Sequence, residues 1–315
     1  MVFEFAIEPE LVATWGNLNN YRFFVDKFGI GESRIMAEYP KLKNWRRRVL
    51  AVAPNDGMAL QRVTALIQIL SESMIARNSV NYDGNLEWLK NAEEEDSNLP
   101  FQAILARLNP RKYPNVLNAE IIGVSNNSKW HIQEQLPDVP RQASDIAEAI
   151  RPLLNNCHKA IFIDPYFMAK DNWWKWQQPF LKFMECLPIE RYALSELRVE
   201  FHASADFSDA RSSQHFKQRC TERLKDCIPN GLSVRFKRWK EKPLGEKLHD
   251  RYLITDIGGV DFSTGIDEGT EGQTQKIALL KLNTYRKIWE DYVSEHPAFF
   301  AEDEFTLVGN KIITS

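Results

Sequence analysis

The 315-residue sequence lacks several features that would place it in a specialised class of protein. No apolar run approaches the roughly 20 residues that a membrane-spanning helix needs, so no membrane partner is expected. The opening residues, MVFEFAIEPE, carry three acids and no basic segment, which disfavours a signal peptide. Internal repeats and low-complexity tracts are also absent. These absences favour a globular protein of the cytoplasm.

Cysteine is scarce, and its spacing does not indicate a metal site. No Cys-x-x-Cys pair occurs, and no histidine lies at the spacing of a zinc ligand. We therefore expect reduced structural thiols, and neither a metal nor a cofactor. The cysteines are Cys157, Cys186, Cys220 and Cys227.

What is present is a large apolar fraction and an uneven charge. The chain is 43% hydrophobic, which excludes a disordered protein and suffices for one large domain or two ordinary ones. The net charge of -3 disfavours a protein that is basic throughout. From Arg211 to Arg251, however, 12 basic residues stand against 5 acidic ones. Such a local excess of positive charge would attract a polyanionic substrate, although a solvated helix face is the common explanation.

Residues 1–142 are predicted to form a mainly helical N-terminal domain. Residues 59–77 carry apolar side chains at helical spacing. Trp45 lies among basic residues, and a position in the core is favoured over stacking on a nucleic acid. The acidic run at 91–98 is expected to be a solvated loop. No family can be attached to this part of the chain.

Residues 143–315 alternate short apolar runs with helical patterns. This alternation predicts a layered α/β domain with a mixed central sheet. The predicted strands cover residues 157–167, 197–206, 232–240, 248–256 and 260–264, and the predicted helices lie at 173–187, at 212–228 and within 276–293.

The most informative stretch is KLHDRYLITDIGGVDFSTGID, residues 247–267. A histidine and an arginine lie two residues apart at the start of a predicted strand, so both project from one face. A neutral imidazole at His249 is able to attack phosphorus and form a phospho-histidine. The guanidinium of Arg251 would neutralise the phosphoryl oxygens as their charge grows.

Three further residues of this stretch are candidates for the same site. Ser263 and Thr264, in a small hydroxyl-rich segment after a Gly-Gly turn, would donate hydrogen bonds to phosphoryl oxygens. Asp256 falls on the opposite strand face, so it is expected to brace the turn.

The spacing His-x-Arg-x-x-x-x-Asp resembles the His-x-Lys-x-x-x-x-Asp signature of the phospholipase D superfamily, in particular its single-motif nuclease branch. The resemblance implies a phospholipase D-like fold for residues 143–315 and a metal-independent phosphodiesterase that cleaves DNA or RNA. It also implies a restriction or anti-phage defence system with a helicase, ATPase or recognition partner. Residues 1–142 would then serve recognition, regulation or partner docking.

The sequence departs from that family in two respects. Arginine replaces the lysine, and the usual Gly-Ser-x-Asn falls on Ser263-Thr264-Gly265-Ile266, so the asparagine is missing. A carboxylate that orients the histidine is not identifiable. The possible neighbours of the site are Asp164, His202, Glu268, Glu271, Thr274 and Gln275.

The leaving group of such a reaction requires an acid, and no second motif is present in the chain. We therefore expect a homodimer in which two copies of His249 share one active site. The alternative is a catalytically silent subunit of the same fold that binds nucleic acid or a partner protein.

Overall fold

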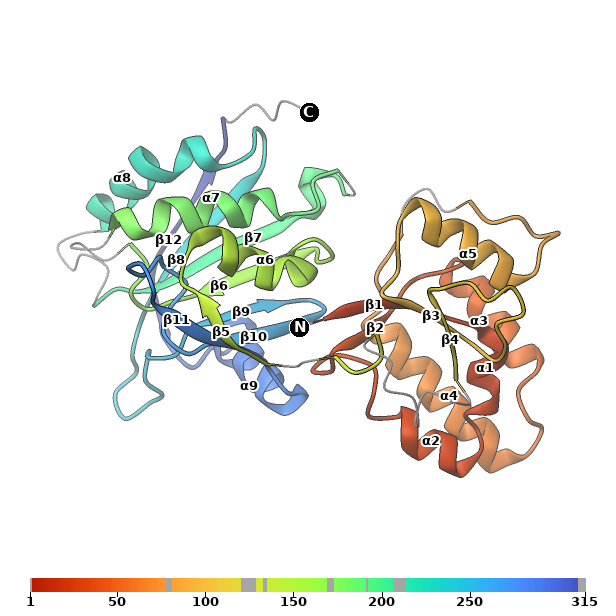
Figure 1. Ribbon diagram of the computed structural model, residues 1–315. Helices are drawn as coiled ribbons and strands as arrows, with labels where there is room; N and C mark the ends of the chain where they lie inside the picture. Colours follow the sequence, from red (N-terminus) through yellow and green to blue (C-terminus); the bar gives the residue numbers. More distant parts are fainter. Residues whose placement is uncertain are drawn as a thin grey trace. The chain divides into compact units, whose positions relative to one another are not determined.

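The computed structural model describes residues 2–77, 81–119, 129–132, 135–168, 173–190, 192–206 and 213–310. The chain divides into two compact units, which comprise Val2–Glu134 and Gln135–Ser315 (Figure 1). The division falls before residue 142 because strand β5 (Gln135–Pro140) pairs with β11 (Thr274–Leu279) of the second unit. Within the described ranges, no helix combines the length and apolar character that a bilayer crossing requires.

The N-terminal unit contains a parallel sheet that the expectation of a mainly helical domain missed. Its strand order is β2-β1-β3-β4, and every neighbouring pair is parallel. The strands have three to five residues and are largely buried, so they show no alternation of apolar and polar residues. Its elements are β1 (Phe3–Ile7), α1 (Pro9–Thr14), α2 (Leu18–Phe24), β2 (Arg34–Met36), α3 (Leu42–Ala51), α4 (Gly57–Glu72), α5 (Trp88–Asn98), β3 (Ala103–Ala106) and β4 (Val116–Asn118).

The position of Trp45 agrees with the favoured expectation. Its side chain is fully buried in the core that also contains Phe5 and Val63. The indole Nε1 donates a hydrogen bond to the carbonyl of Ile7, 2.8 Å away, so its one polar group is satisfied. A nucleic acid cannot stack on this ring.

The acidic run is helical, and the expectation of a solvated loop was wrong. It forms most of α5, in which Glu93, Glu95 and Asp96 are buried. Glu95 accepts a hydrogen bond from Arg77, and Glu93 accepts one from Arg111. Buried carboxylates are tolerated when cations and hydrogen bonds satisfy them, and both arginines lie far from the run in sequence.

The second unit contains a mixed eight-stranded sheet of order β12-β8-β7-β6-β9-β10-β11-β5. Strands β6, β7 and β8 are parallel, and the remaining neighbours pair antiparallel. The predicted α/β class with a mixed sheet is confirmed. The further elements are α6 (Ala143–Leu154), β6 (Lys159–Ile163), η1 (Trp173–Trp176), α7 (Gln177–Glu185), η2 (Leu194–Glu196), β7 (Arg198–Ser204), α8 (Ser213–Leu224), η3 (Lys225–Cys227), β8 (Ser233–Lys240), β9 (Tyr252–Thr255), β10 (Gly258–Phe262), α9 (Leu282–Val293) and β12 (Phe300–Val308).

Helices α7 and α9 cover opposite faces of this sheet (Figure 1). Consecutive residues of β7 show this, because Phe201 packs against Phe180 of α7 whereas His202 lies beside Tyr292 of α9. The four cysteines are buried and form no disulfide, as expected.

Candidate functional site

A small pocket in the second unit contains part of the predicted site. Its volume is about 200 Å³, and it includes Arg251, Thr264 and Asp164. The sequence placed these three residues in or beside one site, and the fold brings them together. The complete lining comprises Arg141, Asp164, Tyr166, Trp176, Arg251, Thr264 and Asp267.

The sheet register explains why Arg251 and Asp164 meet. Ile163 of β6 is paired with Tyr252 of β9 in an antiparallel ladder, so the next residues outward are Asp164 and Arg251. Both therefore lie on the same face of the sheet. Phe262 of β10 donates its amide to the carbonyl of Arg251, which fixes the arginine backbone from the other side.

The guanidinium of Arg251 lies over the ring of Tyr166, with its central carbon 4.9 Å from the ring centroid. Its Nε is buried and has no hydrogen-bond partner among the residues that the structure describes. A buried N–H without a partner is costly, and an anionic oxygen would satisfy it. The pocket thus contains a cation with unused hydrogen-bonding capacity.

Arg141 is a second cation of the pocket, and sequence reasoning missed it. Its Nη2 donates to a carboxylate oxygen of Asp267 at 2.6 Å and to the carbonyl of the same residue at 3.3 Å. Its Nε is likewise buried without a partner in the described part of the chain. Arg141 lies more than a hundred residues before the motif, between β5 and α6, so no local pattern signals it.

Asp164 is buried at the end of β6 and is held by the backbone. One carboxylate oxygen accepts the amide of Tyr166 at 2.9 Å, and the other accepts the amide of Ile266 at 3.3 Å. Burial raises the pKa of Asp164 to about 7, although the two amides and Arg251 oppose the shift. Burial therefore favours the protonated form of this carboxyl more than water does.

His249 does not line this pocket. It precedes β9, and its side chain is 72% exposed, with Nδ1 3.3 Å from a carboxylate oxygen of Asp250. Two residues of chain span at most about 7 Å, so His249 stays close to Arg251 whatever its rotamer.

Asp256 and Ser263 contact the backbone rather than the pocket. The Asp256 carboxylate accepts the amides of His158 and Lys159, each at 3.0 Å, where β6 begins. These bonds brace the strand end opposite to Arg251. Ser263 Oγ accepts the amide of Lys276 at 3.0 Å and so joins the ends of β10 and β11.

The remaining predicted neighbours serve the loop between β10 and β11 or lie elsewhere. Glu268 accepts the amide of Ala143 and satisfies one free amide at the start of α6. Gln275 accepts the amide of Gly265, and its buried Nε2 has no partner within the described ranges. Glu271 and Thr274 are exposed and do not line the pocket.

His202 faces α9 and is separated from the Arg251 pocket by the sheet. Its Nε2 lies 2.9 Å from a carboxylate oxygen of Glu200. Burial lowers the pKa of His202 in spite of this neighbour. Burial acts to raise the pKa of Glu200, but the contacts of Glu200 with His202 and Arg198 lower that pKa to about 2. The pair is buried in the core, and Nδ1 of His202 has no hydrogen-bond partner among the described residues.

The basic segment that precedes the motif is partly neutralised by acids. Arg238 pairs with Asp303, and Lys240 pairs with Glu302 across β8 and β12. The excess of positive charge counted in the sequence therefore overstates the field at the pocket, because β12 supplies acids from outside the counted segment.

In the described ranges, no three His, Cys, Asp or Glu side chains come together as metal ligands would. No protein-family profile and no curated protein matches the sequence. Among solved structures, the chain is similar to that of TrmBL2, an archaeal chromatin protein that shows a novel mode of DNA binding, at 7% identity and a TM-score of 0.23. The match covers 53% of this chain and 52% of that one, so the chain spans about half of its length.

Proposed function

We propose that the second unit is a metal-independent nuclease that binds a nucleic-acid phosphate in the Arg251 pocket and cleaves it through His249. One observation carries the proposal. The arginine of the His-x-Arg motif and a hydroxyl of the following segment line the same pocket, together with a further arginine. Two guanidinium groups and a hydroxyl match the hydrogen-bond acceptors of a phosphodiester.

The chemistry follows from these residues. The imidazole of His249 attacks phosphorus, the bond from phosphorus to the leaving oxygen breaks, and that oxygen takes a proton from an acid. Arg251 and Arg141 neutralise the non-bridging oxygens while charge accumulates on them. Water then cleaves the bond between phosphorus and nitrogen, which regenerates the imidazole and releases the phosphate end.

Two sources of the acid are distinguishable. In a shared site, the second copy of His249 donates the proton across a two-fold axis. Within a single copy, Asp164 lines the pocket and is the candidate donor, because burial raises its pKa to about 7. Dilution below the dimer dissociation constant lowers the specific activity only for the shared site, and Asp164→Asn abolishes activity only for the second arrangement.

A catalytically silent binding subunit is the second candidate, and the exposure of His249 outside the pocket lining favours it. In that case the two arginines hold a phosphate without breaking the ester.

Cleavage of single-stranded and plasmid DNA and of RNA in excess EDTA tests the proposal. Removing the nucleophile in His249→Ala should reduce the rate by at least about a thousandfold. His296→Ala, which removes an exposed histidine elsewhere in the same unit, is the matched control. Binding without cleavage, or cleavage that survives His249→Ala, would overturn the proposed nuclease.

A further inference from the structure

A much larger pocket of about 770 Å³ lies in the N-terminal unit. Glu8 follows β1 directly and Arg107 follows β3 directly, so the pocket opens at the carboxyl ends of these strands. In the order β2-β1-β3-β4, β2 lies on one side of β1, and β3 and β4 lie on the other. The side on which successive strands are added therefore changes at the boundary between β1 and β3. Open parallel sheets bind ligands at this switch point.

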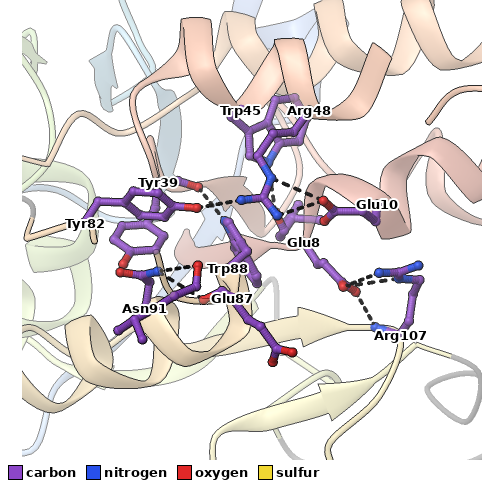
Figure 2. Close-up of polar contacts among 12 residues, drawn as sticks. Glu8, Glu10, Tyr39, Trp45, Arg48, Tyr82, Glu87, Trp88, Asn91 and Arg107 are labelled. Atoms are coloured by element: carbon purple, nitrogen blue, oxygen red, sulfur yellow. Dashed lines mark hydrogen bonds and ion pairs between the residues drawn. The ribbon is translucent and has the colours of Figure 1, made fainter. Parts of the chain in front are cut away.

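The polar part of the pocket is a preorganised set of ion pairs, which Figure 2 shows. Arg107 donates to Glu8 from Nε and Nη2 at 3.1 and 2.8 Å, and its backbone amide binds the other carboxylate oxygen at 2.7 Å. Arg48 lies between the carboxylate of Glu10 and the hydroxyl of Tyr82 (Figure 2). These contacts hold the side chains in place before any ligand binds.

Three polar groups of the lining residues have unused hydrogen-bonding capacity. The two hydrogen bonds that Arg48 donates to Glu10 both go to Oε1. Oε2 of Glu10 accepts no hydrogen bond from the described residues. Within the same part of the chain, Nη1 of Arg107 makes no hydrogen bond and Nε1 of Trp15 is buried without one. The pocket thus offers one charged acceptor, Oε2 of Glu10, and one accessible donor, Nη1 of Arg107, because Nε1 of Trp15 is closed off from solvent.

The charges and the turn after β1 disfavour a phosphate group. Three carboxylates line the pocket against two guanidinium groups, and the residues are Glu8, Glu10, Glu87, Arg48 and Arg107. The turn that binds phosphate in other sheets of this kind is here Glu8-Pro9, with a carboxylate and a residue that has no amide hydrogen. Helix α1 has only six residues.

Apart from Thr14 and Asn20, the remaining lining is apolar and suits a planar ring. Leu11, Phe24, Trp88 and Leu108 contribute to it. We infer that the N-terminal unit binds an unphosphorylated nucleoside, whose base lies against these side chains. Its hydroxyl or amino hydrogens bond to Glu10, and its acceptors take hydrogen bonds from Arg107. This inference is independent of the proposed nuclease.

Calorimetric titration of the full chain with adenosine, guanosine, cytidine and uridine tests it, with AMP, ATP and spermidine as comparison ligands. At least one nucleoside should bind saturably, and its monophosphate should bind at least about tenfold more weakly because carboxylates repel it. Glu10→Gln should weaken binding at least about tenfold, because a charge-assisted hydrogen bond is lost.

Glu72→Gln, on the exposed side of α4, is the matched control and should bind normally. Leu108→Trp fills the pocket from a residue that is 65% exposed, so it should abolish binding without changing the melting temperature. Four results would overturn the inference: no nucleoside binds at millimolar concentration, AMP or ATP binds as tightly, spermidine binds in place of nucleosides, or Glu10→Gln leaves the affinity unchanged.

Discussion

The two pockets of this chain differ in size, in charge and in how they arise from the sequence. The pocket of the second unit measures about 200 Å³ and combines Arg141 and Arg251 with a hydroxyl and with two carboxyl groups, those of Asp164 and Asp267. The pocket of the N-terminal unit measures about 770 Å³ and has more carboxylates than guanidinium groups. The pocket of the second unit therefore suits an anion, and the pocket of the N-terminal unit suits a neutral hydrogen-bond donor.

The pockets also differ in what reveals them. Arg251 and Thr264 of the smaller pocket follow from a run of some twenty residues whose spacing carries a chemical meaning. The N-terminal pocket follows from strand order, because Glu8 and Arg107 come together only when β1 and β3 pair. Motifs reveal sites whose residues are close in sequence, and topology reveals the others.

The largest expected effect is a loss of stability of the N-terminal unit, and it tests whether the two units function separately. Arg77 is fully buried, donates to Glu4 and Glu95, and lies 3.6 Å above the ring of Phe101. Arg77→Met leaves the buried carboxylate of Glu95 and the partly buried one of Glu4 without a cation and should destabilise the N-terminal unit by about 3–5 kcal/mol. Nucleoside binding should fall while cleavage continues, as measured by calorimetry and by the EDTA assay.

Arg46→Met, which removes an exposed arginine of α3, is the control for Arg77→Met and should change neither activity. Equal loss of cleavage in Arg77→Met would show that the two units do not function separately.

The second effect tests the cation of the smaller pocket. Arg251→Ala should slow cleavage by about 10²–10³-fold, the usual loss when one preorganised donor to a developing charge is removed. Arg251→Lys keeps the charge without the planar fork and should lie within about tenfold of the wild type. The initial rate at saturating substrate is the measurement, and an Arg251→Ala enzyme of normal rate contradicts the assigned phosphate site.

The third effect concerns Asp164 and pH. Its pKa is about 7 in the folded chain and 3.8 without the fold, so the folded chain binds the proton more tightly. Stability from this group is therefore full below pH 4 and falls as the pH rises toward 7. Between pH 4.5 and 7.5 the loss should be about 3 kcal/mol.

Urea unfolding of wild type and Asp164→Asn at these two pH values isolates that contribution. Other groups titrate equally in both proteins. The difference in free energy of unfolding between wild type and Asp164→Asn should therefore change by about 3 kcal/mol between the two pH values. If the difference is the same at both pH values, the carboxyl of Asp164 is ionised throughout and is not a proton donor at neutral pH.

The smallest effect concerns the basic segment. Lys240 is half exposed and is paired with Glu302. Lys240→Gln should therefore alter nucleic-acid affinity less than about twofold and stability by less than about 0.5 kcal/mol. Fluorescence anisotropy with a labelled oligonucleotide at two salt concentrations is the measurement. A tenfold loss of affinity would show that the basic residues counted in the sequence attract nucleic acid in spite of their ion pairs.

Much of the second unit was predictable from the sequence, because strands such as β7 and β8 intersperse apolar residues with polar ones over a short segment. Arg251 and Thr264 were predictable members of the pocket because they lie within one motif. Arg141 was not, because only the pairing of β5 with β11 brings it there. The acidic helix was mispredicted for a similar reason, since Arg77 and Arg111 lie outside the run that they neutralise.

The central claim is that His249 forms a covalent bond to phosphorus beside Arg251. Rapid acid-free quenching of the enzyme with an oligonucleotide in EDTA, followed by proteolysis and mass spectrometry, tests it most directly. We predict a phospho-adduct on the peptide that contains His249, which is absent from His249→Ala and present in His296→Ala. Cleavage with no adduct, or with the adduct on another residue, would contradict the account.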